Sequence, residues 1–353
     1  MTSSAFNWVA LLAGLGIVVA VALLVWAMRR PQQGEAARSP FDAHAGAFGG
    51  APAAAESARD AAPLPPAEAA TRFRQAFEPL QRTVYTEGTV FSGSQMSQEL
   101  DALEPLALQA GEQSAELADL RWLQSEVWRR RGEYPAQALQ AGEQSFAIDM
   151  ATHRLAPATQ LERLYWLGVT AEAAGQWETA LTHLRAAQQL IETGQGRPDV
   201  WTPSRKLGLR ERIGYALHEA GHYIQALTHN QQLLQDARQT LGADNPHLRS
   251  VLNNLAQNAY DLRDLPQAEQ WLHERLRIAS LPHNAAAEAG TAFDTLFQLG
   301  VIAHEQGHAE AAQTWFQQRL ALARHLNDAD LIQQAEGDLA ELAQRTRAAS
   351  PAP

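Results

Sequence analysis

The sequence predicts an all-α protein, a stack of helical hairpins (an α-solenoid) that follows one membrane-spanning helix. Three observations predict this fold. After the first third of the chain, Ala, Leu, Gln and Glu predominate and β-branched residues are sparse, a composition that favours helix. A turn pattern recurs at a spacing of 42 to 46 residues. One uncharged apolar run near the N-terminus is long enough to cross a bilayer.

Composition and charge exclude several functional classes. The chain has 353 residues, a formal net charge of −11 and no cysteine. Without cysteine there is no disulfide framework, no thiolate metal site and no cysteine nucleophile. A chain this negative lacks the basic face that a nucleic-acid binder needs, so we expect no nucleic-acid partner.

Residues 8–28 are expected to form a transmembrane helix. No residue in 1–28 is charged, and Trp8 and Trp26 bracket the apolar run, as suits the two headgroup regions. About eighteen helical residues rise roughly 27 Å, close to the roughly 30 Å of a hydrocarbon core. The segment lacks the basic start and the small-residue cleavage site of a signal peptide, so we expect an uncleaved anchor.

Charge around the span predicts its orientation. Arg29, Arg30 and Arg38 follow the span, and no Lys or Arg precedes it. The positive-inside tendency then places the C-terminal part in the cytoplasm, in a single-pass protein of a bacterial-type inner membrane; a periplasmic location is the alternative. Small residues spaced four apart in the span favour helix association in membranes, which leaves a weak homo-oligomer open.

The chain divides into segments of distinct composition. Residues 29–67 are rich in Pro, Ala and Gly and cannot bury enough apolar surface to offset their ordering entropy, so we expect a disordered linker. The other expected segments are an N-terminal tail (1–7), a helical N-terminal cap or degenerate repeat (68–115), about five repeats (116–326), a capping helix (329–346) and a disordered tail (347–353).

Each repeat contains a small residue, a turn residue seven positions later and an alanine five positions after the turn. The turn residues are Gly132, Gly175, Gly221, Arg263 and Gly307. The small residues before the last four turns are Gly168, Gly214, Ala256 and Gly300, and the alanines after them are Ala180, Ala226, Ala268 and Ala312. The first copy departs from the pattern, because its alanine arrives one residue late, at position 138.

This spacing indicates paired antiparallel helices. Small residues let two backbones approach closely, a left-handed glycine ends the first helix, and each pair needs a neighbour to bury its apolar face. We expect first helices near 116–131, 158–174, 205–220, 246–262 and 288–306, and second helices near 134–152, 177–193, 223–240, 266–280 and 309–326. The capping helix should carry Asp330, Glu336, Asp338 and Glu341 on a polar outer face.

The repeats resemble tetratricopeptide repeats, in particular the long variety of kinesin light chains. Residues 241–247, Leu-Gly-Ala-Asp-Asn-Pro-His, and residues 252–256, Leu-Asn-Asn-Leu-Ala, are similar to that subgroup's inter-repeat loop and first helix. The resemblance covers about 116–326 and implies a right-handed α-solenoid whose first helices line a concave groove. It further implies a non-catalytic protein that binds protein or peptide partners in this groove and uses no cofactor.

Repeat register places a set of side chains on the expected groove wall. They are Tyr165, Trp166, Val169, Glu211, Arg212, Tyr215, Asn253, Asn254, Gln257, Phe297, Gln298 and Val301. Asn254 and Gln298 occupy the slot that in related repeats pairs with a peptide backbone, and amides both donate and accept. Arg212 suits a carboxylate and aromatic rings suit apolar side chains. The expected binding residues are Tyr165, Trp166, Arg212, Tyr215, Asn253, Asn254, Gln257 and Gln298.

A protease-like motif offers an alternative function. Residues 218–222, His-Glu-Ala-Gly-His, match the H-E-x-x-H pattern of zinc metalloproteases, in which two histidines bind zinc and the glutamate activates water. Residues 304–308 repeat it at the same place in another repeat. There the turn glycine should end the helix and separate the two imidazoles. We therefore expect no metal site and no catalytic residue.

The sequence thus predicts a membrane-tethered scaffold or adaptor whose span, residues 8–28, holds a partner-binding solenoid near the membrane. The alternative is an envelope-facing assembly factor or chaperone of the same fold in the opposite orientation. The zinc metalloprotease is the least favoured interpretation.

Overall fold

A computed structural model describes residues 63–86, 91–197 and 199–349. These residues form helices and contain no strand, so the predicted all-α class is confirmed for them. Within these ranges, no helix combines the length and the apolar character that a membrane crossing requires. The predicted span, residues 8–28, and the predicted linker up to residue 62 lie outside the described residues.

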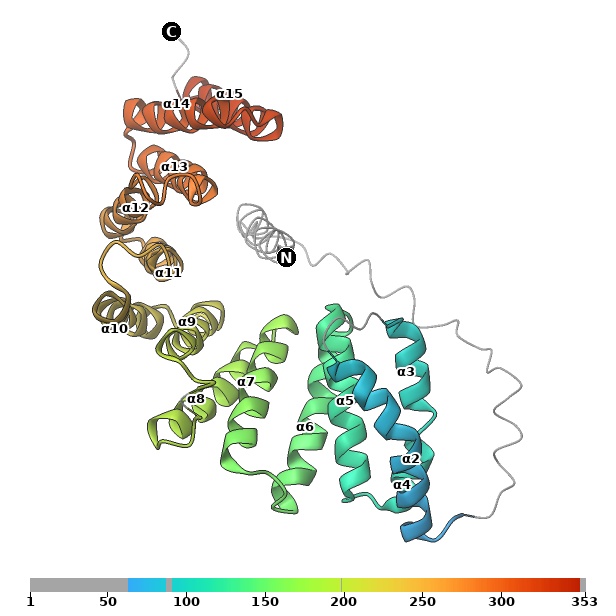
Figure 1. Ribbon diagram of the computed structural model, residues 1–353. Helices are drawn as coiled ribbons and strands as arrows, with labels where there is room; N and C mark the ends of the chain where they lie inside the picture. Colours follow the sequence, from blue (N-terminus) through green and yellow to red (C-terminus); the bar gives the residue numbers. More distant parts are fainter. Residues whose placement is uncertain (1–62, 87–90, 198, 350–353) are drawn as a thin grey trace, which may run out of the picture. The chain divides into compact units, whose positions relative to one another are not determined.

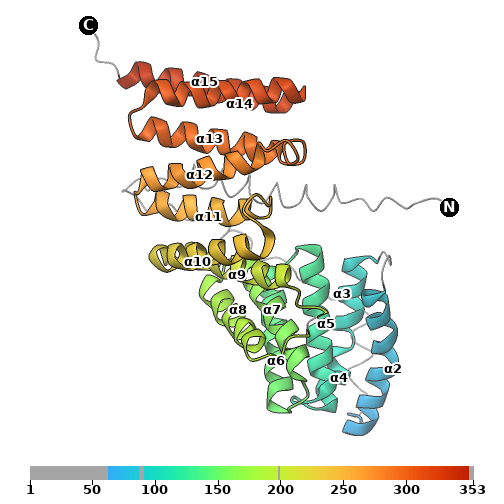
Figure 2. The same ribbon diagram turned by 60° about the vertical axis from the view of Figure 1, so that its left-hand side comes forward.

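Ten helices form five consecutive pairs, and the two helices of each pair run side by side in opposite directions (Figure 1). The pairs are α5 (Ala115–Arg131) with α6 (Pro135–Ala151), α7 (Pro157–Ala173) with α8 (Trp177–Glu192), α9 (Pro203–Glu219) with α10 (Tyr223–Leu241), α11 (Leu248–Asp261) with α12 (Leu265–Ala279), and α13 (Ala289–Glu305) with α14 (Ala309–Leu326). Every expected helix of the repeats is present, and no boundary differs from the prediction by more than two residues. Figure 2 shows α10 to α15 stacked one above another.

The turns between paired helices have the backbone conformation that the repeat pattern predicts. Gly132, Gly175, Gly221 and Gly307 have φ values of 67°, 68°, 81° and 82°. Arg263, the turn residue that is not glycine, also has a positive φ, of 63°. Left-handed φ values cost an L-residue about 1–2 kcal/mol, which explains why glycine fills four of these five turns.

Small residues allow the close approach of paired helices, as expected. A Cβ added at Gly168 would lie 2.5 Å from a side-chain carbon of Leu184, and one added at Gly300 would lie 2.7 Å from the Phe316 ring. The alanines after the turns, Ala180, Ala226, Ala268 and Ala312, are fully buried. Leucines and isoleucines fill the remaining space between the pairs.

Among the described residues, three helices precede the first pair: α2 (Pro66–Tyr85), α3 (Gly93–Asp101) and α4 (Glu104–Ala110). Helix α2 begins inside the segment predicted as linker, because proline at the first helical position needs no hydrogen-bond partner for its nitrogen. Phe73 and Phe77 of α2 are buried in one apolar cluster with Leu120 and Leu123 of α5. The three helices therefore cover the N-terminal end of the repeat stack.

Helix α15 (Ala329–Ala349) packs on α14 and runs three residues past its predicted end. Asp330, Glu336 and Glu341 are exposed, as expected of an end cap. The prediction for Asp338 is wrong. Its side chain is only 19% exposed and forms an ion pair with Arg319 of α14, which needs a counter-charge because it is buried itself.

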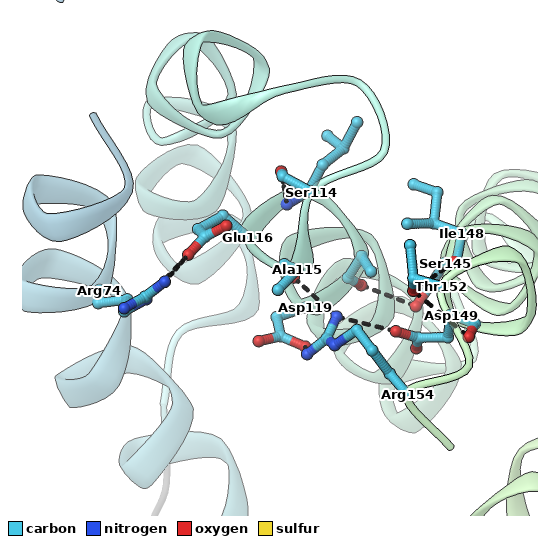
Figure 3. A network of polar contacts seen from close by, with 12 residues as sticks. Arg74, Ser114, Ala115, Glu116, Asp119, Ser145, Ile148, Asp149, Thr152 and Arg154 are labelled. Carbon is cyan, nitrogen blue, oxygen red and sulfur yellow. Dashed lines mark hydrogen bonds and ion pairs between the residues drawn. The ribbon is translucent and has the colours of Figure 1, made fainter. Parts of the chain in front are cut away.

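A buried ion network connects α5 and α6 (Figure 3), and Arg163 extends it to α7. The carboxylate of Asp149 is fully buried and accepts hydrogen bonds from Arg154 (2.8 Å) and from Arg163 of α7. Arg154 reaches back to Asp119 of α5 (3.0 Å). The hydroxyl of Ser145 accepts from Arg163 (2.7 Å), so the two buried polar residues of α6, Ser145 and Asp149, hold the same guanidinium.

Candidate functional site

The first helices of successive pairs are joined by polar side chains 40 to 45 residues apart in the sequence. Arg205 of α9 donates to Glu162 of α7 (2.7 Å), a hydrogen bond of 2.7 Å joins His218 of α9 to Asn258 of α11, and Gln298 of α13 donates to Asn253 of α11 (3.0 Å). Figure 1 shows α9, α11 and α13 on one side of the stack and α10 and α12 on the other.

Helical periodicity identifies the side of these helices that faces away from their partners. In α11, Leu252, Leu255 and Ala259 are buried, and the positions on the opposite side hold Asn254 and Gln257. The same side of the neighbouring helices completes a surface that we name the open face. The open face consists of Gly208, Glu211 and Tyr215 of α9, Ser250, Asn254 and Gln257 of α11, and Asp294 and Val301 of α13.

The predicted binding residues nearest α7 fasten one repeat to the next. The ring of Tyr165 packs edge-on against Trp201 (5.4 Å between centroids), and the guanidinium of Arg129 lies 4.0 Å from the ring of Trp166. Arg212, expected to bind a partner's carboxylate, forms an ion pair with Glu172 of α7. All three predicted side chains are half-buried and none is exposed, because each contacts the adjacent helix.

The four predicted amides fall into two groups. Gln298 donates to Asn253 and accepts from the buried Arg275 (3.1 Å), so these two amides join α11 to α13. Asn254 and Gln257 have no side-chain hydrogen bond within the described part of the chain, although both are half-buried. Two of the four predicted amides are therefore available to a ligand.

Tyr215 contributes a ring to the open face. The ring packs edge-on against Trp177 of α8 (5.6 Å between centroids). Burial, together with a hydrogen bond to the negatively charged Glu219, raises the pKa of the Tyr215 hydroxyl above its usual range. The hydroxyl is therefore neutral and already donates its hydrogen bond to Glu219, so the ring of Tyr215 is the part that can contact a partner.

Glu211 is the most perturbed acid of the open face. Burial raises the pKa of its carboxyl to about 7, against the opposing effect of a hydrogen bond from Ser250 and the charges of Arg249 and Arg212. Asp294 resembles it, since burial raises the pKa of that carboxyl as well. Repeat register places Glu211 on the groove wall. The raised pKa of its carboxyl follows from the packing of α9 against α11, which a local sequence pattern does not predict.

The protease-like motif is divided by its turn, as predicted. His218 lies in the last turn of α9, buried, with its Nδ1 2.7 Å from Asn258 and its Nε2 3.5 Å from Asp261. His222 follows Gly221 and pairs with Glu178 of α8 (2.7 Å), so the two imidazoles contact different helices. In the described ranges no three potential metal ligands come together.

Comparison with known families and structures agrees with this architecture. The tetratricopeptide repeat family matches residues 205–280, the segment from α9 to α12 that carries most of the open face. No curated protein sequence matches this chain. The predicted resemblance to tetratricopeptide repeats is thus confirmed over residues 205–280.

Several solved structures are similar in fold. The apo form of RapI superposes with a TM-score of 0.50 at 10% identity and covers 76% of this chain and 79% of its own. BtubC (BKLC) from P. vanneervenii gives a TM-score of 0.49 at 14% identity, over 75% of this chain and 93% of its own. NprR, solved in complex with its cognate peptide NprX, gives 0.42 at 12% identity, over 78% and 72%. At these identities the likeness concerns the fold alone.

Proposed function

We propose that this protein is a non-catalytic scaffold or adaptor that binds a peptide segment of a partner protein on the open face. The observation that carries the proposal is a pair of amide side chains, Asn254 and Gln257, that form no side-chain hydrogen bond among the described residues and lie on the outward side of α11. A half-buried amide without a hydrogen bond has part of its water removed and nothing in exchange, which favours a ligand that both donates and accepts.

A peptide backbone is such a ligand, because every residue but proline offers one N–H and one C=O. The ring of Tyr215 on α9 flanks the two amides on one side, and Val301 on α13, which packs in part against the apolar cluster around Phe316, adds apolar surface on the other. The open face therefore combines backbone recognition at its centre with apolar contact on either side.

A double alanine variant tests this proposal. Asn254→Ala with Gln257→Ala is expected to lower partner recovery in a crosslinking pulldown about tenfold, since two amide contacts of roughly 0.5–1.5 kcal/mol each are lost. The matched control is Gln231→Ala with Gln235→Ala, two exposed amides on α10. Arg212 and Gln298 are unsuitable for this test because they fasten adjacent repeats. Equal recovery with both double variants would contradict the proposal.

We further propose that residues 8–28 anchor the scaffold in a bacterial-type inner membrane and that residues 29–67 tether it, with the open face in the cytoplasm. The support is the uncharged apolar run bracketed by Trp8 and Trp26, and the arginines that follow it. A tether of this kind raises the effective concentration of the open face for membrane-bound partners.

Topology is testable with a C-terminal alkaline phosphatase fusion, which we expect to be inactive in cells while the protein stays in the membrane fraction after carbonate washing. An active fusion would favour the envelope-facing assembly factor or chaperone, with the same fold in the opposite orientation. Protein in the wash would contradict the anchor itself.

A further inference from the structure

Glu211 carries a carboxylate that no cation neutralises. The two arginines near Glu211 form ion pairs with other residues: Arg212 pairs with Glu172, and Arg249 pairs with Glu288 (3.1 Å). In the described part of the chain, no Lys, Arg or His lies within ion-pair distance of Glu211. The open face thus presents a carboxyl group that ionises near pH 7 and whose surroundings already remove much of its water.

Space for a ligand group lies beside this carboxylate. Gly208 stands one helical turn before Glu211, and a Cβ added there would meet no atom within 4 Å. Glycine in the middle of a helix lowers the stability of the helix by about 1 kcal/mol relative to alanine. Because no atom of the described residues would exclude a methyl group at Gly208, internal packing does not account for the glycine, and close approach by another molecule does.

A second carboxylate stands two first helices away. Asp294 of α13 is half-buried and, among the described residues, forms no ion pair within 4 Å, although the charges of Arg275 and Arg319 act on it and oppose the effect of its burial. Asn254 and Gln257 of α11 lie between it and Glu211, because α11 separates α9 from α13 in the stack. The sequence of groups across the open face is therefore carboxylate, two amides, carboxylate, in a chain of net charge −11.

We propose that the segment bound by the open face is basic, with one Lys or Arg side chain paired with Glu211 in the space left by Gly208 and a second paired with Asp294. Asn254 and Gln257 hold the peptide backbone between these two pairs. This inference rests on the proposed function and specifies the chemistry of its partner.

The physical argument is the cost of covering a charge. A neutral or acidic peptide that covers Glu211 removes its remaining water without providing a counter-charge, which is unfavourable for a buried carboxylate. A cationic side chain offsets that loss and excludes acidic competitors by like-charge repulsion. Burial has already raised the pKa of Glu211 to about 7, so an added cation also favours loss of its proton.

Fluorescence anisotropy with three labelled twelve-residue peptides tests the inference on the purified full chain. The peptides alternate Ala with Lys, Ala with Gln, and Ala with Glu. We expect the Lys peptide to bind at least tenfold more tightly than the Gln peptide, and the Glu peptide to bind more weakly still. Glu211→Gln and Asp294→Asn should each weaken the Lys peptide about tenfold.

Glu112→Gln is the matched control, because Glu112 is an exposed carboxylate in the turn before α5, outside the open face. It changes net charge by the same amount and should leave the affinity of the Lys peptide unchanged. Glu211→Gln removes a desolvated charge that forms no ion pair, and the amide oxygen can still accept the hydrogen bond from Ser250, so we expect its melting temperature at pH 8 to stay level or rise. A loss of binding then cannot come from unfolding.

The pH dependence adds an independent readout. The charged and titratable groups that face Glu211 are Arg212 on its own helix and Arg249 on α11, and both arginines stay charged in this range. With a pKa of about 7, ionisation of Glu211 increases from pH 6 to pH 8, so binding of the Lys peptide should tighten about tenfold. The Glu211→Gln variant should lose this dependence.

Three results would overturn the inference in distinguishable ways. If the Gln peptide binds as tightly as the Lys peptide and Asn254→Ala with Gln257→Ala weakens both, the open face binds peptides but does not select basic ones. If Glu112→Gln weakens the Lys peptide as much as Glu211→Gln does, the attraction is a property of net charge. If no peptide binds and the double alanine variant still recovers its partners, the proposed function fails as well.

Discussion

Replacement of Asp149 by alanine is expected to lower the free energy of unfolding by about 3–5 kcal/mol, the cost of leaving the buried guanidinium of Arg163 without its carboxylate. Asp149 is fully buried and receives hydrogen bonds from both Arg154 and Arg163. The side chain of Arg163 is only 12% exposed, so water cannot replace the lost carboxylate without opening the contact between α6 and α7.

Urea unfolding measures this effect, and an exposed pair provides the control. Asp199 accepts from Arg197 in the loop before α9, with both side chains largely exposed, so Asp199→Ala should leave the unfolding midpoint unchanged. Asp149→Asn should cost less than Asp149→Ala, because the amide oxygen still accepts one hydrogen bond. A loss below 1 kcal/mol for Asp149→Ala would contradict the structural importance of the network.

Alanine at Gly214 is expected to lower the free energy of unfolding by about 2–3 kcal/mol, the upper range of overpacking penalties. The added Cβ would lie 2.0 Å from Oδ1 and 2.8 Å from Cγ of Asn230 on α10. Asn230 is fully buried, so its side chain cannot turn toward solvent to make room for the methyl group. The α9–α10 pair must therefore separate to admit a methyl group.

Gly208→Ala on the same helix is the matched control. Nothing lies within 4 Å of its added Cβ, so the variant should be stabilised by about 0.5–1 kcal/mol through helix propensity. Combining Gly214→Ala with Asn230→Ala should recover most of the loss, since the clash disappears with the amide. Equal destabilisation by the two glycine substitutions would show that the close approach of α9 and α10 is not the cause.

The sequence alone predicts the helices and turns of the repeats accurately, because these depend on local rules that recur. Gly175, Gly221 and Gly307 mark left-handed turns wherever the chain must reverse, and the same physics applies at Arg263 although the residue differs. The alanines after the turns are buried for the same reason in each repeat. Periodicity averages over several copies, and this averaging fixes helix boundaries to within two residues.

The function of individual side chains was less predictable, because pairing across successive repeats depends on how each helix is rotated against the next. Register placed Tyr165, Arg212 and Gln298 on the groove wall, but each contacts the adjacent first helix and strengthens the stack. Asn254 differs from Asn253 by one position, or about 100° of helix rotation, and that rotation leaves it without a partner among the described residues.

Side chains of the first helices have two different functions: some hold neighbouring repeats together, and others lie on the open face and are available to bind a ligand. From α7 to α9, aromatic rings and ion pairs hold neighbouring repeats together. From α9 to α13, amides without a side-chain hydrogen bond and carboxylates without an ion pair within 4 Å lie on the outward side, where they can contact a ligand. Residues 205–280, which match the tetratricopeptide repeat family, include the centre of this second part.

Site-specific photocrosslinking in cells tests the central claim most directly. A photoreactive amino acid replaces Gln257 on the open face in one variant and Gln235 on the exposed side of α10 in the other. The account predicts a discrete protein adduct from position 257, absent from position 235 and lost when Asn254 is also changed to alanine. An adduct from position 235 with none from position 257 would contradict the account.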